Sequence, residues 1–413
     1  MTYLDDKSIY GPVSDWATDF DHADPEYNKN AHAIWDQLRG QCPVAHTERY
    51  GGTWLPVTHE YVHEIAYDTD HFSSRGVVVA TVKPSDNPDA PPAPIGGAPP
   101  ITSDPPFHQH ARRLLLPAFS PKVIDGWEPE IRKLCRELIA EMGDVDHVDA
   151  AVQYAQHIPV NVIARMLGFP LEDSDLFRSF VHNVLEAINL TPGARLEAFQ
   201  ELDAYISKQV QDHIDNPRDD LTNFLLEAKI FDQPLTPQHV TGTIILLLIA
   251  GIDTTWSAIG SSIWHLATNP VDRRRLVDNP ALMPTAIEEF LRAYAPVTMA
   301  RVVKEDYNFH GAEMKENDWV LLPFPAANRD PNEFPDADKV LIDREVNRHA
   351  AFGLGIHRCL GSNLARLELR VAVEEFIAAF PDFELAINEE VKWSVGQIRG
   401  PRELPVRITG RAN

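Results

Sequence analysis

Hydrophobic positions follow helical spacing through most of the chain between residues 107 and 300. Apolar residues recur there three or four positions apart, and segments rich in Pro, Gly or Asp interrupt them. The pattern predicts amphipathic helices at 107–118, 126–142, 148–167, 173–190, 193–214, 219–228 and 237–268. We therefore expect a helical assembly at the centre of the molecule.

The longest of these predicted helices, 237–268, has clear start and stop signals. Thr236 is a favourable N-cap residue, Pro237 suits the first helical position, and the sequence TNP at 268–270 ends the pattern. At 1.5 Å per residue such a helix is about 48 Å long, which is enough to cross the molecule. A functional site can be built against its middle.

Strand-like apolar segments lie outside this helical region. The sequences TWLPVTH at 53–59, WVLLPF at 319–324 and LPVRITG at 404–410 have this character. A helix-like stretch follows the first of them, and a further helix is predicted at about 361–379. The fold class is therefore mainly α with a minor β portion.

Residues 83–106 contain nine prolines, which excludes regular secondary structure there. A long loop of this kind inside an enzyme is typical of a lid or a binding loop. The chain shows no internal repeat of solenoid length and no long Gly/Ser linker. We expect residues 1–413 to form a single domain.

Composition and charge narrow the range of partners. The chain is 44% hydrophobic and 24% charged, as in globular proteins. Its 37 Lys and Arg against 61 Asp and Glu give a net charge of −24, which repels nucleic acid and anionic membranes. The longest strongly apolar run, 244–252, is about half the length of a membrane-spanning helix, and the N-terminus lacks the pattern of a secretory signal. We expect a cytoplasmic protein without nucleic-acid or membrane partners.

The three cysteines, Cys42, Cys135 and Cys359, are too few and too scattered for a disulfide framework, and none belongs to a CxxC motif. An isolated cysteine is usually an inert buried residue. Cys359 differs because it lies in AAFGLGIHRCLGSN, residues 350–363, just before a predicted helix. A helix N-terminus, free backbone N–H groups and nearby cations all favour the thiolate.

The residues around this cysteine suit a flat ligand bound through the sulfur. Three glycines let the backbone turn sharply and approach the ligand closely, while Phe352 and Leu354 keep water from the sulfur. These are features of a thiolate that ligates haem iron. The segment resembles the cysteine-ligand loop of the cytochrome P450 family through its positions Phe352, Gly353, Gly355, His357, Cys359 and Gly361.

Further motifs agree with that family in order and spacing. AGIDTT at 250–255, midway along the longest predicted helix, resembles the oxygen-activation motif. DPPFHQHAR at 104–112 resembles a helix that contacts haem. Glu289 and Arg292 in EEFLR, together with Arg344, resemble the structural ion pairs of the family.

The resemblance extends over residues 15–410 and implies the cytochrome P450 fold, in which a long central helix and the cysteine-ligand loop enclose haem. It implies haem b, iron protoporphyrin IX, with the Cys359 thiolate as axial ligand. Four cationic residues are expected at the haem propionates, and two more residues against the ring. These are His108, Arg112, Arg301 and His357 at the propionates, and Phe352 and Gly353 at the ring.

Asp253 and Thr254 are the expected catalytic residues. A threonine hydroxyl that bonds to the carbonyl four residues earlier can open a groove in a helix, where a small ligand fits. The resemblance implies that Thr254 hydrogen-bonds dioxygen there and that Asp253 relays protons through water.

The expected substrate is a small, mostly apolar organic molecule. The resemblance places its pocket against parts of 76–100 and 180–192. Arg75 and Lys83 are the only cations between Ser74 and Phe107, so a carboxylate-bearing substrate stays an open alternative. The individual residues expected to line the pocket are Leu246, Ile249, Ala250, Val297, Met299 and Val395.

The resemblance implies a monooxygenase that inserts one oxygen atom of dioxygen, by hydroxylation or oxidative dealkylation. We expect a monomer that receives electrons from a separate ferredoxin and its reductase. A basic docking face in this acidic chain would attract an acidic ferredoxin. Its candidate residues are Arg112, Arg113, Arg132, Lys133, Arg136, Arg358, Arg366 and Arg370.

Two alternatives remain at this stage. One is a peroxide-driven oxygenase on the same scaffold, and the other is a non-catalytic haem-thiolate sensor. Both are disfavoured because Asp253 and Thr254 provide the acid and alcohol that dioxygen activation uses.

Overall fold

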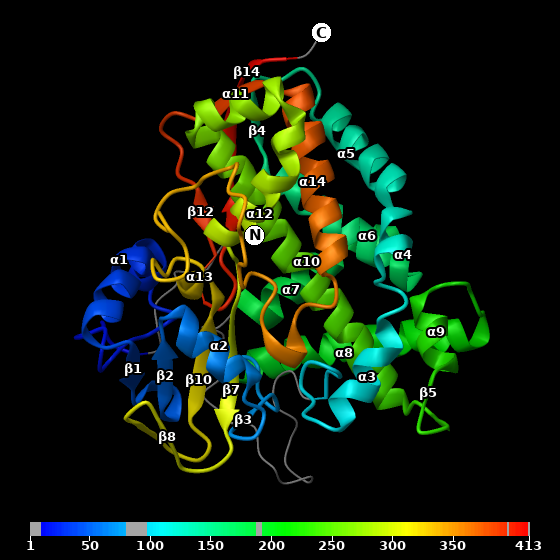
Figure 1. Ribbon diagram of the computed structural model, residues 1–413. Coiled ribbons are helices and arrows are strands. Elements are labelled where there is room, and N and C mark those ends of the chain that lie inside the picture. The colour runs from blue at the N-terminus through cyan, green and yellow to red at the C-terminus, as the bar shows by residue number, and fades with distance from the viewer. Residues whose placement is uncertain (1–9, 80–96, 187–191, 395, 412–413) are drawn as a thin grey trace.

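The computed structural model describes residues 10–79, 97–186, 192–394 and 396–411. A large helical part lies against a smaller β part, which confirms the predicted fold class (Figure 1). The α-helices are α1 (Pro25–Gln41), α2 (His59–Tyr67), α3 (Phe107–Leu115), α4 (Pro121–Asp125), α5 (Glu128–Met142), α6 (His157–Leu167), α7 (Ser174–Val181), α8 (Pro192–Asp215), α9 (Leu221–Glu227), α10 (Pro237–Thr268), α11 (Pro270–Asp278), α12 (Met283–Ala293), α13 (Phe324–Ala327) and α14 (Ser362–Ala379).

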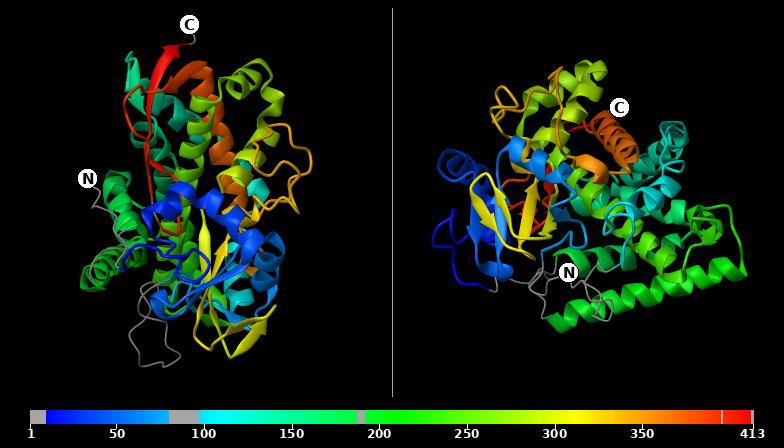
Figure 2. Two further views of the ribbon diagram at one scale, coloured as in Figure 1. Left: turned by 90° about the vertical axis from the view of Figure 1, so that its left-hand side faces the viewer. Right: turned by 60° about the horizontal axis from the view of Figure 1, so that its bottom comes forward.

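The strands are short and most belong to two sheets. The two views of Figure 2 place the larger sheet and α1 on one side of the molecule and α5 on the other. The strands are β1 (Val44–Thr47), β2 (Thr53–Pro56), β3 (Phe72–Ser73), β4 (His147–Asp149), β5 (Lys229–Ile230), β6 (Gln233–Pro234), β7 (Thr298–Val303), β8 (Tyr307–Phe309), β9 (Ala312–Met314), β10 (Trp319–Pro323), β11 (Asp382–Leu385), β12 (Lys392–Trp393), β13 (Pro401–Glu403) and β14 (Pro405–Gly410).

Helix α10 is the central element of the helical part, where it contacts α6, α8 and α14. Its bounds confirm the prediction, and the Thr236 hydroxyl accepts a hydrogen bond from the His239 N–H at 3.2 Å. By length and composition α10 could cross a membrane, but 72% of its most apolar window is buried inside the protein. The apolar run therefore belongs to a core helix.

Strand β10 lies at the centre of a five-stranded sheet with the order β1-β2-β10-β7-β3. It pairs antiparallel with β7 and parallel with β2. Because successive side chains point to opposite faces, Trp319 and Leu321 pack with α1, whereas Val320 and Leu322 pack with α2. The strand is buried on both faces and joins the two hydrophobic clusters of the β part.

The predicted helix 148–167 is wrong at its beginning. Residues His147–Asp149 form β4, which pairs antiparallel with β14 near the C-terminus. The Asp149 carboxylate accepts the backbone N–H groups of Ala151 and Val152 at 2.9 Å. A π-helical turn is formed by Ala151–Ala155, and α6 starts only at His157. This segment forms a strand because its pairing partner lies far away in the sequence. The spacing of apolar residues within the segment cannot reveal such a partner.

Other predicted elements differ in their bounds. The helix predicted at 107–118 ends at Leu115, shortly before Pro117, and the one predicted at 173–190 is α-helical only to Val181, after which a π-helical turn follows. Residues 187–190 lie outside the described part. Helices α1, α11 and α12 are additional to the predicted set; α1 and α11 have mostly polar sequences, in which the apolar spacing is weak.

The proline-rich segment is described only from Gly97 onward, and residues 97–106 contain turns but no helix or strand. This end of the segment rests directly on α10. The Thr243 hydroxyl donates to the Pro99 carbonyl at 3.1 Å. A Cβ on Gly242 would lie 1.9 Å from the Gly97 oxygen, so only glycine fits at that crossing. The segment is thereby attached to the helix that carries the AGIDTT motif.

Candidate active site

The cysteine loop is a tight turn packed against the end of α2. Gly353 and Gly355 have φ values of +70° and +66°, which glycine adopts without strain. A Cβ on Gly355 would lie 2.2 Å from the Ala66 oxygen. The Cys359 N–H donates to the Phe352 carbonyl at 2.7 Å and closes the turn. The fixed glycines therefore set the position from which the sulfur is presented.

Cys359 lies deep in the protein and still has accessible surface, so its side chain lines an internal space. Burial raises the pKa of the thiol, while the Gly361 N–H and nearby arginines, Arg112 first among them, act in the opposite direction. The backbone N–H group and the arginines thus favour the thiolate, in the direction expected from the sequence, and burial opposes them. A metal cation on the sulfur would reverse this balance, since a coordinating thiol is deprotonated.

One stripe of α10 is accessible while most of the residues around it are buried. Leu246, Ala250 and Thr254 form this stripe at spacings of four residues, which places them on one face of the helix. The Thr254 hydroxyl donates to the Ala250 carbonyl at 2.8 Å, the bond that sequence reasoning described. The stripe offers apolar surface and one hydroxyl to a small ligand.

Two arginines and two histidines converge at one edge of the site. The rings of His108 and His357 lie 4.2 Å apart, and His357 Nε2 lies 2.8 Å from the Ser74 hydroxyl. Arg112 donates to the Arg358 carbonyl, and Arg301 donates to the carbonyl before it at 2.8 Å. Neither ring nitrogen of the buried His108 has a hydrogen-bond partner among the described residues.

The electrostatics of this group indicate a missing anionic partner. Burial, followed by Arg301, His108 and Arg112, lowers the pKa of His357 to about 2, and burial lowers the pKa of Arg301 to about 10. Repulsion of this kind is costly unless a bound anion offsets it. Haem carries two propionates, so these residues fit that group at its edge, as Cys359 fits it at the iron.

Asp253 is held by an arginine that sequence reasoning missed. Arg402, in β13, donates to Asp253 Oδ1 at 2.5 Å and to the Ser257 hydroxyl at 2.9 Å. Both charged side chains are completely buried, and the guanidinium lies 4.4 Å from the centre of the Trp256 ring. The sequence does contain one signal for such an arginine, because an aspartate inside an apolar helix requires a partner that is buried with it.

The expected structural ion pairs meet at Glu289. Arg292 donates to both carboxylate oxygens at 2.8 Å, and Arg344 donates to Oε2 at 3.0 Å. Asn347 and the Leu341 N–H complete the shell around this fully buried carboxylate. The cluster joins α12 to the segment that leads to the cysteine loop.

Of the expected pocket residues, Leu246 and Ala250 lie on the accessible stripe of α10, and the other four fall into three groups. Val297 and Met299 are half-buried on alternate positions at the start of β7, as residues on one face of a strand are. Ile249 packs in the main hydrophobic core instead of on the accessible stripe of α10. Val395 lies outside the described residues, and so do Lys83 and most of the segment around it.

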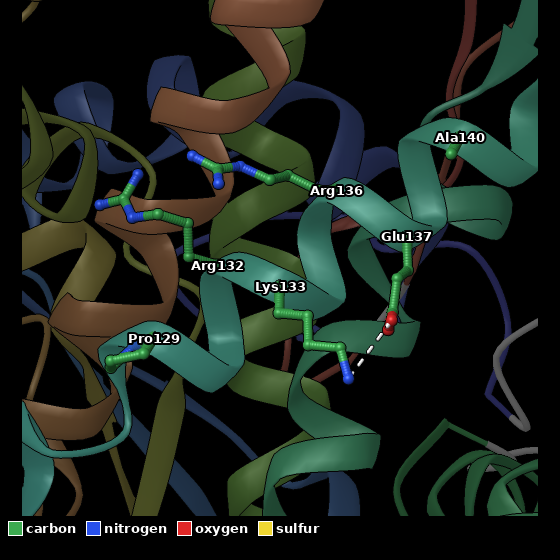
Figure 3. A pocket seen from close by; sticks show the side chains of 6 residues that line it. All are labelled: Pro129, Arg132, Lys133, Arg136, Glu137 and Ala140. Carbon is green, nitrogen blue, oxygen red and sulfur yellow. Dashed lines mark ion pairs between the residues drawn. The ribbon is translucent and has the colours of Figure 1, made fainter.

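The predicted basic face is largely neutralised. Arg132, Arg136 and Arg370 form ion pairs with glutamates of α5 and α14, and Arg366 pairs with Glu288. Figure 3 shows the surface hollow along α5, where Arg132 and Arg136 point toward α14. The exposed Lys133–Glu137 pair, 3.6 Å apart, points away from α14.

Comparison with known proteins agrees with the fold and the site. Residues 55–279 and 275–392 match the family model described as Cytochrome P450. Mycinamicin IV hydroxylase/epoxidase from Micromonospora griseorubida is 36% identical over 313 residues, which are 74% of this chain and 79% of that protein. Nocardicin C N-oxygenase from Nocardia uniformis subsp. tsuyamanensis is 34% identical over 91% of this chain and 95% of that protein.

A solved structure gives the same result for the fold. CYP109E1 from Bacillus megaterium in complex with testosterone matches with a TM-score of 0.85 and 30% identity, over 93% of this chain and 99% of that chain. The names of the sequence relatives describe hydroxylation, epoxidation and N-oxygenation, all of which insert oxygen. The chain belongs to the cytochrome P450 family, whose members bind haem through a cysteine thiolate and act as monooxygenases.

Proposed function

We propose that residues 1–413 form a single haem b domain that inserts one atom of dioxygen into a small, mostly apolar organic molecule. The reaction is hydroxylation or oxidative dealkylation, and the enzyme works as a monomer in the cytoplasm. The observation that carries this proposal is the set of three features around one internal space. They are an accessible buried cysteine, two arginines that converge with two histidines, and an apolar stripe with one hydroxyl on α10.

Each feature has a role toward the cofactor. Cys359 would ligate the iron, and His108, Arg112, Arg301 and His357 would hold the propionates, with Phe352 and Gly353 against the ring. Haem with a thiolate ligand supplies the activation of dioxygen when electrons and protons are delivered to it. The apolar surroundings exclude water and keep the substrate near that centre.

Asp253 and Thr254 are proposed to handle the protons. The Thr254 hydroxyl now donates to the Ala250 carbonyl on the accessible face of α10, and it would be able to donate to dioxygen bound beside that face instead. Asp253, one position earlier, can pass a proton from Oδ1 only when Arg402 releases it, since that oxygen accepts from the guanidinium. The presence of both side chains favours dioxygen over peroxide as the oxidant.

The proposed substrate class rests on the stripe on α10 and on Val297 and Met299, which are expected to line the same pocket. These side chains are apolar, so the substrate would be recognised mainly by shape and burial. The relatives named above act on mycinamicin IV and nocardicin C, and the solved structure holds testosterone. Steroids are the first to test, because their rigid apolar skeleton agrees with the apolar stripe and the solved structure holds one.

The test is an absorption titration of the purified ferric protein. Terpenes, steroids, alkylbenzenes, methoxybenzoates and fatty acids are added in turn, and a low-to-high spin shift with one class identifies the substrate type. Cys359→Ser should abolish the thiolate spectrum while Cys135→Ser, at a buried cysteine outside the site, should keep it. Absence of haem after reconstitution would overturn the proposal, and Thr254→Ala with unchanged coupling of electrons to product would overturn the role of Thr254.

A further inference from the structure

The segment 396–400, shortly before β13, lies antiparallel beside the start of β7. Two backbone hydrogen bonds of 2.8 Å join the residues on either side of Val297 to the residues on either side of Ile398. They enclose an antiparallel bridge in which Val297 and Ile398 lie directly opposite each other. Side chains in such a pair lie close together on one face. Ile398, which is half-buried like Val297, therefore extends the row of expected pocket residues.

The face of β7 that carries Val297 lies on the side of the cysteine loop. Val297 and Met299 pack against the same hydrophobic cluster as Leu354, which belongs to that loop. Ala300, at the alternate position, packs in the cluster that contains α1. Side chains alternate between the two faces of a strand. One face of β7 therefore belongs to the expected pocket, and the opposite face supports it.

Gln397 is buried beside this strand, and its side chain joins three backbone segments. Its Oε1 accepts the Val79 N–H at 2.8 Å, while its Nε2 donates to the Thr298 carbonyl at 2.9 Å and to the Val77 carbonyl at 3.4 Å. Only 6% of the residue is exposed. One amide group thus sets the spacing between the segment 77–79, the start of β7 and its own loop.

The chain that carries Gln397 continues directly onto α10. A Cβ on Gly400 would lie 2.3 Å from the Ser257 Cβ, so the backbone touches the helix there. Two residues later, Arg402 donates to Asp253, one turn earlier on α10. The loop is therefore fixed at both ends, to β7 and to the part of α10 that carries the hydroxyl of the site.

We propose that Gln397 is a positioning residue for the substrate, which keeps Val297, Met299 and Ile398 in contact with a ligand in the haem pocket. The inference rests on the proposed function, because the pocket is the one described there. An amide suits this role, since it offers an acceptor and two donors in one plane. An apolar side chain would remove all three hydrogen bonds, and buried backbone groups that lose a partner shift toward another one.

The experiment uses two ligands that bind ferric haem iron through an imidazole nitrogen and shift its absorption band. Imidazole itself is small, whereas clotrimazole carries three aromatic rings that must pack against the walls of the pocket. Both are titrated into the haem-loaded full chain. Gln397→Leu should weaken clotrimazole binding at least about tenfold and change the affinity for imidazole by less than about twofold.

The matched control is Gln156→Leu. Gln156 is also buried, and its Nε2 donates to the Val152 carbonyl, but it lies in the turn before α6, which supplies none of the site residues. This variant should lose stability without a change in either affinity. If Gln397→Leu does not fold, Gln397→Glu keeps the size and the acceptor but loses both donations, and it should show the same selective loss.

The outcomes separate this inference from the proposed function. Equal weakening of both ligands in Gln397→Leu, or unchanged binding of clotrimazole, would overturn the positioning role alone. A selective loss of clotrimazole in Gln156→Leu would overturn it as well, because any buried glutamine would then have the same effect. Absence of an imidazole shift in the wild type would overturn the haem pocket, and with it both proposals.

Discussion

A carboxylate inside an apolar helix needs an opposite charge, and here that charge comes from the far end of the chain. Asp253 and Arg402 are both fully buried and 2.5 Å apart. Removing one member of such a pair leaves the other charge buried without compensation, which is more costly than the loss of a surface pair. The pair therefore links Asp253, which is proposed to handle protons, to the stability of the whole molecule.

Arg402→Gln should lower the free energy of unfolding by about 3–5 kcal/mol, because Asp253 would stay buried without its guanidinium. Urea unfolding of the haem-loaded protein measures this change. Arg407→Gln, at an exposed pair, should cost less than about 1 kcal/mol. Similar losses in the two variants would contradict the argument.

Residues that act together could be predicted from the sequence when they are close neighbours in it. The cysteine loop was recognisable because its glycines, histidine and cysteine occupy ten consecutive positions. The Glu289 cluster was recognisable from a short motif with one remote member. Arg402 was not, because no local pattern connects β13 with the middle of α10, and only the folded chain brings them together.

At the scale of elements, loop geometry limits which residues can hold the cysteine in place. Gly355→Ala should reduce haem incorporation strongly, because its Cβ would lie 2.2 Å from the Ala66 oxygen in addition to the strain of a φ of +66°. Haem content per protein, from the absorption ratio, measures the effect. Gly311→Ala has a φ of +92° but open space around its Cβ, so it should cost about 1–2 kcal/mol in stability and leave haem content unchanged.

The contact between α12 and α14 should depend on pH. Burial tends to raise the pKa of Glu288, but hydrogen bonds from Arg366 and His349 outweigh it and lower the pKa from 4.5 to about 2. Because the folded-state pKa is depressed, the stabilisation is present above the unfolded value near 4.5 and is lost as the pH falls toward 2.

Glu288→Gln should therefore lower the melting temperature most at pH 7, and its difference from the wild type should shrink as the pH falls below about 4.5. Thermal unfolding followed by circular dichroism at several pH values measures this. Arg366→Gln removes the same pair from the other helix and should give the same pH profile. A difference that stays constant with pH would contradict the assignment.

The sequence predicted the existence of the helices whose apolar residues are regularly spaced, and for α10 it also predicted the first and last residue. This was possible because caps and apolar spacing are local properties of the sequence. The beginning of the predicted 148–167 helix was not, since β14 supplies the partner that makes β4 a strand. Helices α1 and α11 depend on tertiary contacts of a few apolar residues, such as Trp35 and Leu276, more than on a regular pattern.

For the molecule as a whole, ion pairs limit which arginines of the predicted basic face are available to an electron donor. Among the described residues of the predicted basic face, Arg112, Arg113 and Arg358 have no carboxylate in an ion pair, and Arg112 is half-buried beside the cysteine loop. We infer that an acidic ferredoxin would approach Arg113 and Arg358, which are exposed. The net charge of −24 would oppose that approach at long range.

Replacing Arg113 and Arg358 with Glu should raise the KM for an acidic ferredoxin at least about tenfold and reverse the effect of salt on the rate. Steady-state turnover with a titrated ferredoxin and reductase pair measures both. Arg370→Gln should lower stability instead, because its guanidinium joins α14 to Glu128 of α5. If Arg370→Gln raised the KM as much as the replacement of Arg113 and Arg358 does, the result would contradict this docking face.

The accessible stripe of α10 has a consequence for how such enzymes diversify. Leu246 and Ala250 face the internal space, whereas the residues between them hold the core together. A lineage can therefore exchange these two positions and acquire a new substrate while its fold is inherited intact. Natural variation should accumulate there, and the buried remainder of the helix should change only slowly from ancestor to descendant.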